Sequence, residues 1–121
     1  MFKKVCIIGC GLIGSSIARG IKKNKLATKL VSSNRSNSTN KKVIRLKIVN
    51  EASSDTKKIV KGSDLIIFAS PLSSYKNIIL KIKSSIKSRT ILTDVGSVKK
   101  NAISLIEKIF LKIYLGFHHI L

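Results

Sequence analysis

The sequence predicts an α/β fold in which a mainly parallel sheet carries helices on both faces. Short continuous apolar runs alternate with longer amphipathic stretches along the chain, which is the pattern of the strand–helix units that build a parallel sheet. The 121 residues suffice for one domain but not for two. With 44% hydrophobic and 24% charged residues, the composition is that of an ordinary globular protein, which excludes wholesale disorder.

The first half of the chain contains two strand–helix units and the start of a third. Val5 to Ile8 is a continuous apolar run, which we expect to form a buried strand. Residues 15–23 place apolar side chains at helical spacing opposite basic ones, and we expect this helix to end at Asn24 and Lys25. The next expected elements are a strand over 29–33, a loop over 34–40, a helix over 41–48 and a short strand around Val49.

The second half opens with one or two helical turns within 55–61, which Gly62 and Ser63 end. Asp64 to Ser70 follows as the clearest strand of the sequence. Pro71 cannot extend the hydrogen bonding of that strand but suits a helix start. The remaining expected elements are a helix over 75–86, where isoleucines recur at helical spacing, a fifth strand over 90–93, a helix over 98–110 and a sixth strand over 112–115.

The charge balance is strongly basic, with 24 Lys and Arg against 5 Asp and Glu and a formal net charge of +19. Such a chain would attract nucleic acid or anionic lipid. The lysines recur in small groups along nearly every segment, however, without the interleaved aromatic residues that base stacking needs. We therefore expect no specific nucleic-acid partner, and a basic polyanion-binding protein without enzyme activity stays an open alternative.

Two cysteines near the start, Cys6 and Cys10, have no His or Cys partner at metal-ligand spacing, so we interpret them as core residues and expect no metal site. The apolar stretch before Cys10 is shorter than the ~7 to 15 residues of a signal-peptide core. No run approaches the ~20 apolar residues of a membrane span. The sequence therefore predicts a cytoplasmic protein that has no membrane partner.

The motif GxGxxG follows the first expected strand and precedes the first expected helix. In this context it predicts a dinucleotide-binding loop and a doubly wound, Rossmann-type domain with strand order 3-2-1-4-5-6. Gly9 would form the tight turn, Gly11 would admit the pyrophosphate, and Gly14 would let helix pack on strand. Leu12 and Ile13 complete the motif. The cofactor would lie across the carboxyl ends of the first and fourth strands.

The end of the second expected strand predicts which dinucleotide binds. An acidic residue normally binds the adenosine ribose there, but this chain has Asn34, Arg35 and Ser36. A guanidinium and a hydroxyl suit a 2′-phosphate, and no carboxylate is present to repel it. The sequence therefore favours NADP, with NAD as the alternative. Arg35 is otherwise one more surface cation or a side chain that stacks on the adenine.

The segment Thr93 to Lys99, TDVGSVK, is the most specific motif in the sequence. Together with GxGxxG and the turn Ala69-Ser70-Pro71-Leu72, it resembles the prephenate and arogenate dehydrogenases of tyrosine biosynthesis. The resemblance spans nearly the whole chain and implies an NAD(P)-dependent oxidoreductase that decarboxylates prephenate or arogenate oxidatively. It also implies that Ser70 and Pro71 lie at the cofactor.

The resemblance further implies two catalytic residues. His118 falls on the position of the catalytic histidine of the family, and Ser97 would hold that imidazole or the substrate hydroxyl in place. Phe117 and His119 differ from the small residue and the proline that flank this histidine in the family. From the residues alone, Ser97 is equally a helix N-cap, and a histidine near a terminus is usually only solvated.

Members of the family continue into a helical domain that forms a dimer and binds the substrate carboxylates. We expect residues 1–121 to form the NAD(P)-binding domain alone, without this helical domain, and to be inactive in isolation. A homodimer is expected for full-length members. Another small Rossmann-type NADP oxidoreductase, such as a reductase of the pyrroline-carboxylate type, is the alternative enzyme.

Overall fold

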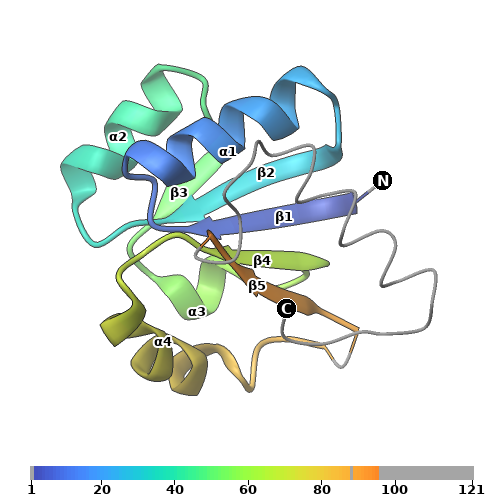
Figure 1. The fold of residues 1–121 in the computed structure, drawn as a ribbon, viewed down its shortest axis with the longest axis vertical. Helices are drawn as coiled ribbons and strands as arrows, with labels where there is room; N and C mark the ends of the chain where they lie inside the picture. Colours follow the sequence, from blue (N-terminus) through green and yellow to red (C-terminus); the bar gives the residue numbers. More distant parts are fainter. Residues whose placement is uncertain (1, 88, 96–121) are drawn as a thin grey trace.

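A computed structural model of the chain describes residues 2–87 and 89–95, which alternate between strands and helices (Figure 1). In chain order the elements are β1 (Phe2–Ile8), α1 (Leu12–Lys23), β2 (Ala27–Ser33), α2 (Asn37–Arg45), β3 (Glu51–Ser53), α3 (Thr56–Ile59), β4 (Leu65–Phe68), the 3-10 turn η1 (Leu72–Ser74), α4 (Tyr75–Ile82) and β5 (Ile91–Asp94). This alternation is the one that the apolar pattern predicts. The expected helix over 98–110 and strand over 112–115 lie outside the described residues.

The strands form a sheet of order β3-β2-β1-β4-β5 over the described residues, and their pairings are parallel. The central strand β1 places Ile7 beside Ser32 of β2 and Ile67 of β4. The predicted order of the first five strands is therefore confirmed. After β3 the chain crosses to the other side of β1, so the carboxyl ends of β1 and β4 lie at the switch point where doubly wound sheets bind ligands.

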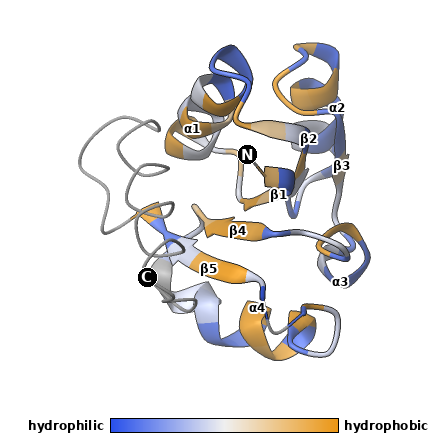
Figure 2. Ribbon diagram, turned by 90° about the vertical axis from the view of Figure 1, so that its right-hand side faces the viewer, coloured by the Kyte–Doolittle hydropathy of each residue, from blue (hydrophilic) through white to orange (hydrophobic). Residues whose placement is uncertain are grey.

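Helices cover both faces of the sheet: α1 and α2 lie on one side, and α3 and α4 on the other (Figure 2). Alternate residues of each strand enter the two cores. In β1, Val5 and Ile7 pack toward α1, whereas Cys6 and Ile8 pack toward α3 and α4. Because the inner strands are buried on both faces, they have continuous apolar sequences instead of alternating ones.

Two elements predicted after β2, a helix and a short strand, lie at other positions than expected. The helix begins at Asn37, within the expected loop, because Ser36 caps it: the Ser36 Oγ accepts the N–H of Thr39 at 3.4 Å. It ends at Arg45, before the expected end at Ile48, and Lys47 then takes a positive φ of 57°. The third strand lies at 51–53 instead of around Val49, which is buried in the core just before it.

Other elements also differ from their expected bounds, with β1, α1 and α4 changing most clearly. β1 begins at Phe2, whose N–H donates to the Leu26 carbonyl at 3.1 Å. α1 begins at Leu12, directly after the glycine loop. α4 ends at Ile82 instead of Ile86, because the chain turns there and the Ser85 N–H donates to the Ile82 carbonyl at 2.7 Å.

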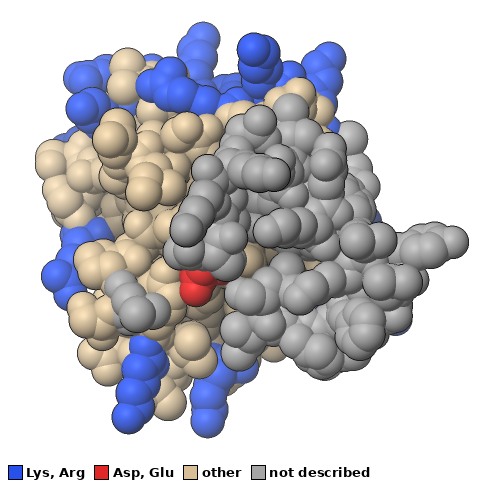
Figure 3. Space-filling model, viewed as in Figure 1, with Lys and Arg blue, Asp and Glu red and all other residues tan. Residues whose placement is uncertain are grey.

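On the face drawn in Figure 3, lysine and arginine side chains lie mainly along the upper edge, with others at the left and at the bottom. Lys29 pairs with Glu51 at 3.2 Å, and both side chains are about half exposed. Within residues 2–87 and 89–95, no helix has the length and apolar character needed to cross a membrane.

Candidate functional site

The loop between β1 and α1 contains the first glycine of the motif in a conformation that requires glycine. Gly9 takes a positive φ of 94°. Its N–H donates to the Ser33 carbonyl at 2.8 Å, and a Cβ at Gly9 would lie 3.0 Å from the backbone nitrogen of Ser70. The loop is thus packed against the carboxyl ends of both β2 and β4.

Gly14, the last glycine of the motif, lies in the first turn of α1 and is buried. A Cβ there would overlap the carbonyl oxygen of Gly9 and would lie 3.2 Å from the Cβ of Ala69. Glycine at this position therefore allows α1 to pack closely on the turn that follows β1. The close helix–strand packing predicted from the motif is present.

Gly11 lies in a different environment from the other two motif glycines. Its φ of −75° is available to any residue, and among the described residues a Cβ there would meet no atom within 4 Å beyond its chain neighbours. It is also the N-cap of α1, which has no side-chain cap. The first N–H groups of a helix have no partner within it, so this end of α1 presents backbone donors and positive dipole charge beside an open space.

The next two residues of the motif are apolar and exposed. The side chain of Leu12 is 91% exposed and that of Ile13 is 58% exposed. Exposed large apolar side chains at a helix start do not contribute to the core of this domain. The turn from Gly11 to Ile13 therefore offers both polar backbone groups and apolar side chains to a ligand.

At the end of β2, the side chain of Asn34 points into the protein. Its side chain is 6% exposed, and the Oδ1 accepts the N–H of Cys10 at 2.6 Å. From the sequence we expected Asn34 to contact the ribose, in the place of the usual acidic residue. In the structure its side-chain amide is hydrogen-bonded to other residues of the chain instead. Sequence reasoning also missed Asn40, a buried partner of Asn34, although a polar residue on the same helical face as Val43 was a usable signal.

Arg35 and Ser36 follow Asn34 and are exposed. Ser36 is the N-cap of α2, and its Oγ lies 2.6 Å from the Oγ of Ser38. The first turn of α2 contains no acidic residue. A second helix N-terminus, with a guanidinium and two hydroxyls beside it, thus lies next to the glycine loop.

The end of β4 contributes Ser70 and Pro71. Ser70 is half-buried and lies against Gly9, and its Oγ accepts a hydrogen bond from the Ser74 Oγ at 2.9 Å. Pro71 precedes the turn η1, and its carbonyl accepts the N–H of Ser74 at 2.9 Å. The predicted helix start after Pro71 is confirmed, with a 3-10 turn before α4.

At the end of β5 the described part of the TDVGSVK segment is Thr93 to Val95, and the strand ends at Asp94, one residue beyond the expected end at Thr93. Tyr75 lies nearby: its hydroxyl donates to the Phe68 carbonyl at 3.3 Å. Burial, and secondly the Asp94 carboxylate, raise the pKa of Tyr75 above its ordinary value. Ser97 and His118 lie outside the described residues, so their catalytic roles stay predictions.

Neither cysteine has the properties of a reactive thiol. Burial raises the pKa of Cys6 to about 12. Burial also raises the pKa of Cys10, although a hydrogen bond with Ser32 opposes this shift. In the part of the chain that the structure describes, no group of three or more His, Cys, Asp or Glu side chains could hold a metal ion.

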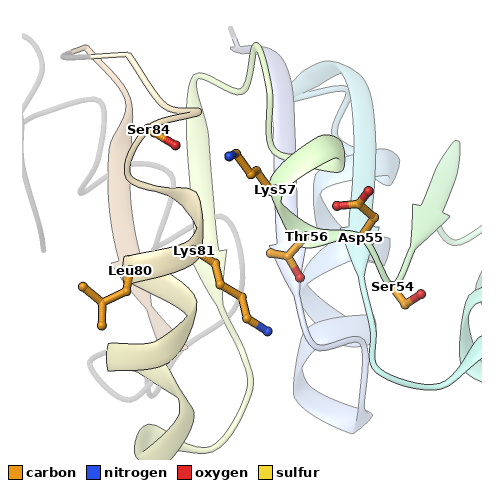
Figure 4. Close-up of a pocket in the computed structure, with 7 residues that line it drawn as sticks. All are labelled: Ser54, Asp55, Thr56, Lys57, Leu80, Lys81 and Ser84. Atoms are coloured by element: carbon orange, nitrogen blue, oxygen red, sulfur yellow. The ribbon is translucent and has the colours of Figure 1, made fainter.

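A groove between α3 and α4 lies on the face of the sheet opposite α1 (Figure 4). Lys57 extends from α3 and Lys81 from α4 across the space between the two helices. The residues that line the groove are Ser54, Asp55, Thr56, Lys57, Leu80, Lys81 and Ser84. These seven include none of the residues that the sequence predicts for the cofactor site.

A comparison with known families identifies the chain. The model described as "Prephenate dehydrogenase, nucleotide-binding domain" matches residues 17–121, which is most of the chain. The chain belongs to this family. The matched range begins after the glycine motif and includes the positions of Ser97 and His118. The family suggested by the TDVGSVK segment is confirmed.

Known proteins are similar to this chain over most of its length. Prephenate dehydrogenase of Lactococcus lactis subsp. cremoris (strain MG1363) is 33% identical over 109 residues, which cover 89% of this chain and 30% of that protein. Prephenate dehydrogenase from A. aeolicus, in complex with hydroxyphenyl propionate and NAD+, superposes with a TM-score of 0.75 at 24% identity, covering 90% of this chain and 38% of that chain.

Synechocystis arogenate dehydrogenase has a TM-score of 0.70 at 24% identity, covering 84% of this chain and 37% of that chain. These structural similarities confirm the Rossmann-type fold. The chain spans about a third of the length of these relatives, 30% of the Lactococcus protein and 38% of the A. aeolicus chain.

Proposed function

We propose that this chain is the NAD(P)-binding domain of an oxidoreductase that decarboxylates prephenate or arogenate oxidatively in tyrosine biosynthesis. Family membership supports the substrate class. The cofactor site is supported chiefly by Gly11, because no contact among the described residues requires a glycine there. We take residues 1–121 as one cofactor-binding domain; its dimerisation and its cytoplasmic location stay predictions of the sequence.

The glycine loop fits the diphosphate of a dinucleotide. The N–H groups that begin α1 at Leu12 and Ile13 would donate to phosphate oxygens, and the helix dipole would stabilise their negative charge. A diphosphate would occupy the open space beside Gly11, which a larger side chain would fill. When bound, the nicotinamide supplies the acceptor for the hydride.

We further propose that NADP binds more tightly than NAD. Arg35 is exposed at the end of β2, beside the Ser36-capped start of α2. This arrangement supplies a guanidinium, hydroxyl groups and a helix N-terminus for a 2′-phosphate, and residues 34–40 contain no carboxylate to repel it. The A. aeolicus relative was solved with NAD+, so NAD is the alternative that the following experiment decides.

The experiment is calorimetric titration of NADP and NAD into the chain and its Arg35→Ala variant. A charge-assisted hydrogen bond contributes about 1.5 to 3 kcal/mol, so Arg35→Ala should weaken NADP binding roughly tenfold or more and leave NAD binding unchanged. Arg45→Ala is the matched control, because it removes the same charge from the other end of α2. Equal losses for both cofactors in Arg35→Ala would contradict a 2′-phosphate contact and leave adenine stacking.

For the chemistry, we propose that His118 accepts the proton of the substrate hydroxyl while hydride leaves the carbon that bears it. Loss of carbon dioxide then makes the ring aromatic. An imidazole titrates near neutral pH, which suits this proton transfer. Ser97 would hold the imidazole or the hydroxyl in position. These roles are supported by the resemblance and by the family match over both positions.

The chemistry is tested by the formation of reduced cofactor from prephenate and from arogenate. We expect no useful turnover by the chain alone, because positioning the substrate contributes about 7 to 11 kcal/mol of barrier lowering and the family binds the substrate carboxylates with its helical domain. Fusion to the helical domain of a full-length relative should restore turnover. His118→Asn should abolish it without weakening cofactor binding, whereas His119→Asn is the control. Turnover by the isolated chain would contradict this proposal.

A further inference from the structure

Asn34 is a buried polar residue to which the proposed cofactor contacts give no role. It lies at the end of β2, where Rossmann-type domains normally present the residue that binds the ribose. Its side chain is nevertheless 6% exposed. We propose, on the basis of the proposed function, that Asn34 is a positioning residue: it fixes the glycine loop relative to the start of α2 and does not itself contact the cofactor.

The first step concerns the glycine loop. The Oδ1 of Asn34 accepts the N–H of Cys10 at 2.6 Å, and this bond is buried. Cys10 directly precedes Gly11, so the bond fixes the peptide from which the chain enters the open turn. The directions of the N–H groups at the start of α1 depend on that peptide. Asn34 thereby acts on the diphosphate site without touching the diphosphate.

The second step concerns α2. The Nδ2 of Asn34 donates to the Oδ1 of Asn40 at 2.9 Å and to the Ser32 Oγ at 3.0 Å. Asn40, which is also 6% exposed, returns a hydrogen bond from its Nδ2 to the Asn34 carbonyl at 3.4 Å. Both amide hydrogens of Asn34 are therefore used within the protein. A side chain without a remaining donor cannot donate to a ribose oxygen in this conformation.

The consequence is a division of roles between neighbouring residues. Arg35 and Ser36 would distinguish a 2′-phosphate from a 2′-hydroxyl, whereas Asn34 would support the binding of both cofactors. NAD and NADP differ only at this ribose position. A residue that acts through the glycine loop should therefore change both affinities by the same factor, and a residue that contacts the ribose should change them unequally.

The experiment compares Asn34→Ala with Asn50→Ala in the 121-residue chain. Asn50 is the matched control because its Oδ1 likewise accepts a backbone N–H distant in the sequence, that of Leu30 in β2, at 2.8 Å. The dissociation constants of NAD and NADP are measured by calorimetry at a temperature where circular dichroism shows each variant to be folded. Asn34→Ala should weaken both cofactors by the same factor, about tenfold, and Asn50→Ala should change neither by more than about twofold.

Hydrogen exchange supplies a readout that general destabilisation would not reproduce. The Cys10 amide should exchange faster in Asn34→Ala than in the wild type, whereas Asn50→Ala should leave it protected. Asn34→Asp, which keeps an acceptor for this N–H, should restore the protection. If Asn34→Ala does not fold, Asn40→Ala takes its place, with a smaller but equal loss of both affinities expected.

Three outcomes would overturn the inference. A loss confined to one cofactor would show that Asn34 contacts the ribose, and unchanged affinities would show that it does not position the loop. Cys10 exchange that does not respond to Asn34→Ala would show that their bond does not hold the peptide. Failure of the unaltered chain to bind either cofactor would instead contradict the proposed function, and the inference would fall with it.

Discussion

The two ends of the parallel sheet differ in how backbone N–H groups are hydrogen-bonded. At the amino end, side chains of the domain bind them: the Asp64 Oδ2 accepts the N–H of Lys3 at 2.6 Å, and Asn50 binds that of Leu30 at 2.8 Å. At the carboxyl end, side chains also bind the N–H groups of Cys10 and Thr39, but α1 begins at Gly11 without a side-chain cap. The start of α1 therefore presents backbone donors that a ligand can bind, whereas the amino-end contacts serve the stability of the sheet.

The same contrast separates the glycines of one motif. Gly9 and Gly14 are required by contacts within the protein, because a side chain at either would meet backbone atoms. A side chain at Gly11 would contact no other described residue beyond its chain neighbours. We therefore expect a substitution at Gly14 to lower mainly the stability of the domain, and a substitution at Gly11 to lower mainly its affinity for the cofactor.

The largest expected effect on stability is that of Gly14→Ala. The added methyl group would overlap the carbonyl oxygen of Gly9, which is backbone and cannot move away without shifting β1 or α1. We expect a loss of about 3 kcal/mol in the free energy of unfolding, at the upper end of overpacking costs. Urea denaturation followed by circular dichroism measures it. A variant as stable as the wild type would contradict the close packing of α1 on the glycine loop.

Gly11→Val should abolish cofactor binding and change the stability of the domain only slightly. Its backbone conformation is ordinary and its surroundings among the described residues are open, so we expect the free energy of unfolding to fall by no more than about 1 kcal/mol, the cost of a valine at a helix N-cap. The valine methyl groups would occupy the space of the diphosphate, so NADP should no longer raise the melting temperature. Thermal unfolding with and without NADP tests both statements. A melting temperature that still rises would show that the diphosphate lies elsewhere.

An amino-end variant supplies the control for Gly11→Val. Asp64→Ala removes a hydrogen bond to β1 at the end of the sheet away from the glycine loop. It should lower the free energy of unfolding by about 1 kcal/mol and leave NADP affinity unchanged. Loss of binding in this control would show that cofactor affinity follows overall stability and not the geometry of the carboxyl end.

The sequence predicts well those parts of the fold in which a residue type or pattern has a single physical explanation. The apolar runs around Val5 and Ile66 predict buried parallel strands, because only such strands are apolar on both faces. Gly9 and Gly14 were assigned their turn and packing roles from the motif, and the structure shows both contacts. The order of the first five strands followed from the position of this motif.

The sequence predicts poorly those parts that depend on hydrogen-bond partners elsewhere in the chain, or on a helix cap within a polar segment. The start of α2 was missed because residues 37–40 are polar, and the Ser36 cap alone marks the helix. Asn34 was interpreted as a ribose contact because its inward orientation depends on Asn40, six residues later. The catalytic assignment of His118 rests on resemblance alone, since no spacing of titratable residues identifies it.

The most direct test of the account is an NADP titration followed in amide proton–nitrogen correlation spectra of the chain. The central claim is that the carboxyl end of the sheet, and not the amino end, binds the cofactor. It predicts large shifts for the amides of Gly11, Leu12 and Arg35, and unchanged signals for Lys3 and Leu30. Shifts confined to Lys57 and Lys81, which line the groove between α3 and α4, or to the amino end, would contradict it.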